Sequence, residues 1–244
     1  MANDPIIYVA DAGSMAKGNF HWVSSQGNAT PSDDPAKLAS AISADLGEGR
    51  CVALGYECPL FVPCNETPKT LGCAREGECV EATGNRPFTA GAGASVFATG
   101  IQSLAWVLRQ IKQSHPAATA TTRWRDFQSG QYRLFVWEAF VSGSEKAYPP
   151  SHAGDASLAI DAFKQVMRNE ANPTRVKCAR SFSLAGAAIL YAGLSTDVGL
   201  LSEPCVVLRP IFSAEESKGR LSGYKLRQAE AKKAKAQKTK GGDI

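Results

Sequence analysis

The sequence is short of histidine and of recognisable nucleophile motifs, which narrows the chemistry open to it. Only three histidines occur among its 244 residues, and no Ser–His or Cys–His pair stands out. Serine and cysteine hydrolases that form an acyl-enzyme need such a nucleophile beside a base. The glycine-rich residues 90–95 also lack the lysine of a Walker phosphate loop. Any catalysis would therefore depend on other side chains.

A basic leader and a long apolar run are missing as well. The first residues, Met-Ala-Asn-Asp-Pro, carry no basic region, apolar core or cleavage site, so we expect no signal peptide. The longest apolar stretch, residues 182–201, is broken by Gly186, Gly193 and Asp197, and its continuous part is too short for a membrane span. The seven cysteines are an odd number, and without an export signal we expect reduced thiols. These features favour a cytoplasmic protein that does not associate with membranes.

The composition is that of a globular chain with a basic end. With 44% hydrophobic and 20% charged residues, the chain can bury the core of one large domain. Its net charge of +4 arises at the end, because residues 218–244 hold nine Lys or Arg against Glu230 and Asp243. We therefore expect a domain over residues 1–214 and a basic tail, helical or frayed, over residues 215–244.

Apolar runs and helical spacings alternate along the chain, which is typical of an α/β fold. β-branched and aromatic residues favour buried strands at residues 6–11, 50–57 and 132–140, and residues 19–23 are expected to form a hairpin with the first. Residues 58–94, rich in Cys, Gly and Pro, are expected to form a long irregular insertion. Helices are expected at residues 35–47, 94–112, 154–168 and 183–194, and a short last strand at residues 204–210.

Each of the three main strands carries an acid at or near its carboxyl end, namely Asp11, Glu57 and Glu138. Asp155 lies on the inward stripe of the helix expected at residues 154–168. If the strands are neighbours, these acids converge, and carboxylates that converge in an interior raise one another's pKa unless a cation compensates them. Mg²⁺ and Mn²⁺ prefer carboxylate oxygens, and two such ions can clamp the oxygens of a phosphodiester. The pattern therefore predicts a magnesium or manganese site.

Three short segments carry a resemblance to a known family: Val-Ala-Asp-Ala-Gly at residues 9–13, Ala-Leu-Gly-Tyr-Glu-Cys-Pro-Leu at 53–60 and Asp-Ala-Ser-Leu-Ala-Ile at 155–160. Together with the order of elements, they resemble the ribonuclease H-like superfamily, above all its Holliday-junction resolvase branch and a related domain family of unknown function. The resemblance implies a mixed sheet flanked by helices and two-metal hydrolysis of phosphodiesters.

The same resemblance implies a role for each acid. Asp11 would bridge both ions, while Glu57 and Asp155 would each bind one of them. Glu138 would be a further ligand or a support. The long insertion at residues 58–94 and the weaker match at Glu138 depart from the family pattern.

Two other readings remain open from the sequence. Residues 10–14 with residues 19–22 also look like the phosphate-gripping hairpin of actin-like and sugar-kinase ATPases, which implies an ATP-dependent small-molecule kinase. Residues 90–95 would then serve as an anion loop at a helix N-terminus. No second acidic, glycine-rich phosphate loop is evident. The third reading is a non-catalytic module of the same fold that binds nucleic acid or protein.

The cysteines of the insertion and the lysines of the tail give weaker signals. Cys58, Cys64, Cys73 and Cys79 are separated by five, eight and five residues. Zinc knuckles use intervals of about two to four, so unrelated reduced cysteines are favoured over a structural zinc. Lys-rich residues 232–240 could contact the phosphate backbone of a nucleic acid or could only aid solubility.

Overall fold

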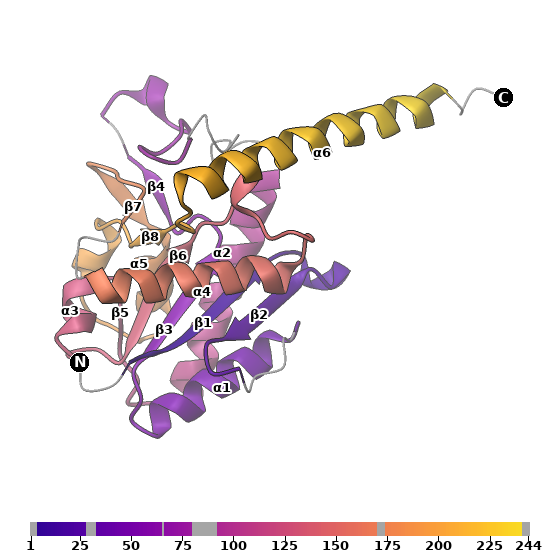
Figure 1. The fold of residues 1–244 in the computed structure, drawn as a ribbon. Coiled ribbons are helices and arrows are strands. Elements are labelled where there is room, and N and C mark those ends of the chain that lie inside the picture. Colours follow the sequence, from indigo (N-terminus) through magenta and orange to yellow (C-terminus); the bar gives the residue numbers. More distant parts are fainter. Residues whose placement is uncertain (1–3, 28–32, 65, 80–91, 170–173, 241–244) are drawn as a thin grey trace.

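A central sheet lies between two layers of helices in the computed structural model, which describes residues 4–27, 33–64, 66–79, 92–169 and 174–240 (Figure 1). The sheet mixes antiparallel and parallel strands. The class expected from the sequence, α/β with a mixed sheet flanked by helices, is therefore confirmed.

The main sheet places three strands from the first 57 residues beside a strand from the middle of the chain. Its members are β1 (Ile6–Ala12), β2 (Phe20–Ser24), β3 (Val52–Glu57), β5 (Ala120–Thr121), β6 (Leu134–Ala139) and β8 (Val207–Leu208). Their order is β2-β1-β3-β6-β5, and β8 also pairs with β6. Only β2 runs antiparallel to its neighbour, so β1, β3 and β6 all end at one edge of the sheet. Functional groups of α/β proteins collect at that edge.

The two helical layers are unequal. The helices are α1 (Pro35–Gly47), α2 (Ala92–Ser114), α3 (Trp124–Gln128), α4 (His152–Asn169) and α5 (Leu184–Tyr191). One buried cluster joins α1, α2 and α5 to one face of the sheet, and a second joins α3 and α4 to the other. Figure 1 shows α4 lying across the near face, with α2 behind the sheet.

Strand alternation decides which residues face which layer. In β1, Tyr8 and Ala10 belong to the cluster with α1 and α2, whereas Ile7 and Val9 belong to the cluster with α4. Since successive side chains of a strand point to opposite faces, Asp11 follows Ile7 and Val9 toward α4. The strand is buried on both faces, which explains why its sequence is a continuous apolar run.

Helix α1, which follows the hairpin, begins at the capping residues that the sequence predicts. The Asp34 side chain accepts a hydrogen bond of 2.8 Å from the Ala36 N–H, and Pro35 occupies the first turn. Leu38, Ile42 and Leu46 then bury the inward stripe of α1, as their spacing predicts.

The insertion is more regular than the sequence suggested. β4 (Phe61–Pro63) pairs antiparallel with β7 (Ser181–Ser183) in a second sheet, and a 3₁₀ turn follows at η2 (Pro68–Thr70). Leu60 and Phe61 are buried in the core, so burial fixes this part of the segment. The expectation of a wholly irregular insertion was wrong for its first part, and residues 65 and 80–91 lie outside the described residues.

The expected basic tail is a helix, α6 (Ala214–Lys240), that projects from the body (Figure 1). Its first part packs against the 3₁₀ turn η4 (Gly143–Glu145). Two further 3₁₀ turns among the described residues are η1 (Met15–Lys17) and η5 (Val198–Leu201). Over the described part of the chain, none of the helices has the length and apolar character needed to cross a bilayer.

Candidate functional site

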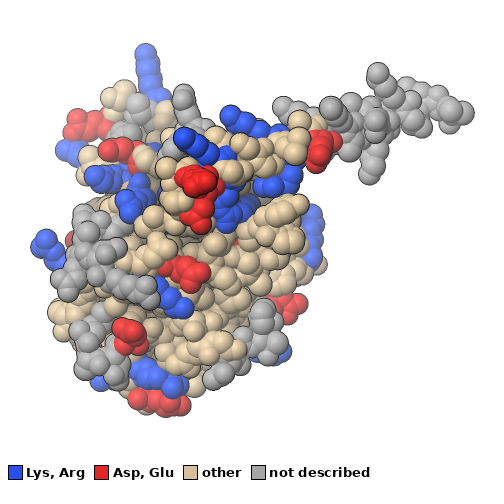
Figure 2. All heavy atoms as spheres, viewed as in Figure 1, with Lys and Arg blue, Asp and Glu red and all other residues tan. Residues whose placement is uncertain are grey.

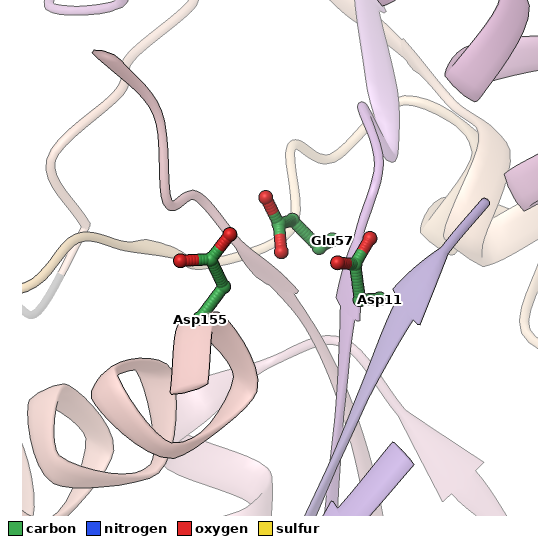
Figure 3. A group of neighbouring side chains, drawn as sticks. All are labelled: Asp11, Glu57 and Asp155. Atoms are coloured by element: carbon green, nitrogen blue, oxygen red, sulfur yellow. The ribbon is translucent and has the colours of Figure 1, made fainter. Parts of the chain in front are cut away.

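Three carboxylates meet at the carboxyl edge of the sheet (Figure 3). Asp11 lies at the end of β1, Glu57 at the end of β3 and Asp155 in the first turn of α4. One oxygen from each lies within 4.8 Å of the others. Their side chains are 11%, 13% and 6% exposed, so the group is nearly buried but reaches the surface. We call these three residues the acid group.

The register of the sheet explains why two of these acids meet. Asp11 is the direct partner of Glu57 in the parallel pairing of β1 with β3. Paired residues in a parallel ladder point to the same face, and here that face is the one covered by α4. Asp155 completes the group because α4 begins beside the ends of both strands (Figure 3).

Glu138 does not join the acid group. It pairs with Tyr56 rather than Glu57, and it therefore points to the opposite face of the sheet. There both of its oxygens accept hydrogen bonds of 2.7 Å from the Arg75 guanidinium, and Oε2 also accepts one of 2.9 Å from the Leu60 N–H. The expectation that Glu138 converges with the other acids as a further ligand was therefore wrong, and Glu138 instead holds the insertion to the sheet through a fully buried ion pair with Arg75.

Burial raises the pKa of two of the three carboxyl groups, Asp11 and Glu57. Burial raises the pKa of Glu57 well above its usual value, and the neighbouring charge of Asp11 raises it further. Burial also raises the pKa of Asp11, although the hydrogen bond from His152 opposes this shift. A cation bound among the three oxygens would reverse both shifts.

A lysine that the sequence did not single out supplies part of that positive charge. Lys146 Nζ lies 2.9 Å from Asp155 Oδ2 and 3.6 Å from Glu57 Oε1. Burial lowers the pKa of Lys146, but the charges of Glu57 and Asp155 outweigh burial and the pKa is raised overall. Lys146 lies in a loop without periodicity, so no pattern in the sequence could have placed it here.

His152 is a second missed residue, and for this one a signal existed. Its Nδ1 lies 2.5 Å from Asp11 Oδ2, and its ring stacks on His21 with centroids 5.0 Å apart. His152 precedes Asp155 by three residues, one turn of α4, so the two side chains lie on the same side of the helix. His152 thus orients Asp11, as the Ala147 N–H orients Asp155 through a hydrogen bond of 2.6 Å.

One carboxylate oxygen of the acid group accepts no hydrogen bond from the described residues. Glu57 Oε2 is buried and has no hydrogen-bond partner in the described part of the structure. A buried carboxylate oxygen without a partner is costly, and a cation is one way to satisfy it. Three carboxylates face one lysine, so acidic groups outnumber basic ones at the site. Both features fit a cation-binding site built from oxygen ligands.

The cysteines considered as zinc ligands do not belong to the acid group. Cys58 is buried, whereas Cys64, Cys73 and Cys79 are exposed, and all are free thiols. The acid group is the one set of potential metal ligands that the described residues bring together, and it includes none of them. Of the proposed anion loop, residues 90 and 91 lie outside the described residues.

A pocket adjoins the turn that follows Asp11. Its volume is about 560 Å³, and Gly13, Ser14, Thr99, Gln102 and Trp106 are among the residues that line it. The turn is tight, because a Cβ on Gly13 would come within 2.1 Å of the Asn19 carbonyl oxygen. Only glycine therefore allows the chain to pass here.

Comparisons of the chain with family models, with curated proteins and with solved structures found no match.

Proposed function

We propose that the protein is a divalent-cation-dependent hydrolase of phosphodiester bonds that acts on nucleic acid. The observation that carries this proposal is the acid group itself: three nearly buried carboxylates from β1, β3 and α4, with oxygens within 4.8 Å of one another. A structural protein gains little from gathering like charges in this way, whereas such groups are common at functional sites.

The donor set matches magnesium or manganese. All the clustered ligands are carboxylate oxygens, which these hard cations prefer, and none of them is a thiolate or an imidazole. The unpartnered Glu57 Oε2 supports the same conclusion. When bound, such ions would activate a water and stabilise the charge that develops on the phosphate.

The residues around the acid group would prepare it for a cation. His152 holds Asp11 in place, and the Ala147 N–H does the same for Asp155. Lys146, with a side chain 48% exposed, neutralises part of the acid group in the absence of metal. We propose Asp11 as the ligand shared between ions, with Glu57 and Asp155 on either side, as the resemblance to ribonuclease H-like nucleases implies. The mixed sheet flanked by helices supports that resemblance.

The experiment is a cleavage assay on EDTA-treated full-length protein with single-stranded and branched DNA. We expect cleavage only after Mg²⁺ or Mn²⁺ is added, and its loss in Asp11→Asn and in Asp155→Asn. Asp161→Asn is the matched control, because Asp161 is an exposed residue of the same helix. Cleavage at the wild-type rate by Asp11→Asn would contradict the proposal.

A second candidate is the ATP-dependent small-molecule kinase, and the pocket beside Gly13 and Ser14 is the observation that favours it. A nucleotide there would lie next to Trp106, whose side chain lines the pocket. Titration with ATP and Mg²⁺ tests this candidate. A fluorescence change on ATP addition that disappears in Trp106→Phe would support the kinase. A wild type whose fluorescence does not change on ATP addition would contradict it.

A further inference from the structure

A basic pocket lies next to the segment that carries Lys146. Its volume is about 460 Å³, and its wall includes Ser144 and Glu145, the residues directly before Lys146. The next residue, Lys146, lies 2.9 Å from Asp155 through its Nζ, and the Ala147 N–H donates a hydrogen bond to the same carboxylate. One stretch of backbone therefore lines the pocket and contacts the acid group.

Three arginines give this pocket its charge. Arg175, Arg209 and Arg220 line it together with one acid, Glu145, so the lining carries a net charge of +2. Figure 2 shows several basic side chains, with acidic ones among them, where α6 leaves the body of the protein. A concave surface lined by one sign of charge attracts the opposite sign.

One of the arginines is already used by the fold. Arg209 donates hydrogen bonds to both oxygens of Glu145, at 3.1 and 3.0 Å, and one of 2.8 Å to the Gly77 carbonyl oxygen. Both side chains of this pair are nearly buried. Arg209 therefore neutralises Glu145 and stiffens the wall, rather than offering donors to a ligand.

The other two arginines are available. Arg175 is exposed, and its backbone N–H is fixed by a hydrogen bond of 2.8 Å to the Val207 carbonyl oxygen. Arg220 stacks 3.9 Å from the centre of the Phe212 ring and reaches the Lys146 carbonyl oxygen at 3.4 Å. Neither guanidinium forms an ion pair with an acid among the described residues. A guanidinium has five N–H donors, so both retain donors for an anion.

We propose that this basic pocket binds a backbone phosphate of single-stranded nucleic acid next to the phosphate that is cleaved. The inference rests on the proposed function, because the pocket would bind the same strand whose neighbouring phosphate lies at the acid group. Arginine binds phosphate oxygens through paired donors. The apolar part of the wall, Pro210, Ile211 and Phe212, offers a surface for the sugar or base.

The test measures the affinity of the full chain for a short fluorescent oligothymidylate by anisotropy, in EDTA, over a range of salt concentrations. We expect Arg175→Gln and Arg220→Gln each to weaken binding by about threefold to tenfold and to flatten the salt dependence by about 0.7 in log–log slope. Arg109→Gln is the matched control, since Arg109 is an exposed residue of α2 that does not line the pocket, and its substitution removes the same charge. The lysines of α6 are present in every variant, so their contribution cancels.

If Arg175→Gln and the wild type bind the oligothymidylate with equal affinity and equal salt dependence, the proposed role of the basic pocket is contradicted. An equal loss in Arg109→Gln would overturn it as well, because binding would then follow net charge alone. Mn²⁺ binding, followed by electron paramagnetic resonance in the same samples, separates this result from the proposed function. We expect Mn²⁺ to bind all three variants as it binds the wild type, and a wild type without Mn²⁺ binding would contradict the hydrolase alone.

Discussion

Replacement of Lys146 by methionine should change the acid group in two opposite ways. Lys146 Nζ lies 2.9 Å from Asp155 and 3.6 Å from Glu57, and it is the cation closest to both. Methionine keeps the apolar stem but removes the charge. Without metal, the three carboxylates then repel one another with less compensation. With metal, the divalent cation no longer has to displace the lysine.

The size of both effects follows from the geometry. Unit charges about 4 Å apart near a protein surface attract by about 4 kcal/mol. Because the Lys146 side chain is 48% exposed, solvent and side-chain entropy reduce the net stabilisation to about 0.5–1 kcal/mol. For a chain of this size, that loss lowers the Tm by about 1–4 °C in EDTA. The same free energy, no longer opposing the metal, raises the Mn²⁺ affinity by about two- to fivefold.

Thermal unfolding in EDTA and a Mn²⁺ titration measure these two changes on the same protein. Lys164→Met is the control, because Lys164 is an exposed residue on the same helix as Asp155. We expect Lys146→Met to melt earlier in EDTA and to gain more from Mn²⁺ than the wild type. A variant that melts at the wild-type temperature and binds Mn²⁺ no more tightly would refute this account of Lys146.

Three other substitutions test the acid group and its surroundings. In EDTA at neutral pH, Glu57→Gln should stabilise the protein by about 0.5–2 kcal/mol, as relief of functional-site strain often does. Because burial and Asp11 raise the folded-state pKa of Glu57, this advantage should shrink as the pH falls through that raised pKa, and a pH-independent Tm difference would contradict it. Arg75→Met should cost about 3–5 kcal/mol in urea unfolding, since Glu138 is left buried without its cation, and a loss below about 1 kcal/mol would contradict the buried pair. His152→Ala should raise the pKa of Asp11 and move half-maximal Mn²⁺ binding to higher pH, whereas His152→Asn, which keeps a donor, should move it less; an unchanged pH profile would show that His152 does not act on Asp11.

The strands and most helices could be predicted because their signals are local. The apolar run at residues 6–11 became β1 (Ile6–Ala12), and the spacing of Leu38, Ile42 and Leu46 became the buried stripe of α1. The inward position expected of Asp155 is confirmed by its burial. These features depend on neighbours in sequence, which a single chain displays.

The error over Glu138 has a physical cause. A strand that is buried on both faces reads as a continuous apolar run, so its sequence does not reveal which residues face which layer. In β6, Glu138 points to the same face of the sheet as Leu134 and Val136, which is the face covered by α2 and α5. The inward stripe of the helix could predict that Asp155 joins the acids, but it could not indicate that α4 covers the face of the sheet opposite to Glu138.

Residues that come from loops were beyond prediction for a different reason. Lys146 and Arg75 reach their carboxylate partners from segments without periodicity, 9 and 63 residues away along the chain. Long-range ion pairs of this kind depend on the path of the loop, which only the folded structure fixes. Both the charge balance of the acid group and the anchor of the insertion were therefore invisible in the sequence.

The most direct test of the central claim is a Mn²⁺ titration of the EDTA-treated protein, followed by electron paramagnetic resonance and repeated with Asp11→Asn. We expect the wild type to bind Mn²⁺ saturably, because one oxygen from each of the three carboxylates lies within 4.8 Å of the others and Glu57 Oε2 has no partner among the described residues. We expect that binding to be lost or greatly weakened in Asp11→Asn. A wild type that binds no Mn²⁺, or an Asp11→Asn variant that binds it equally well, would contradict the metal site.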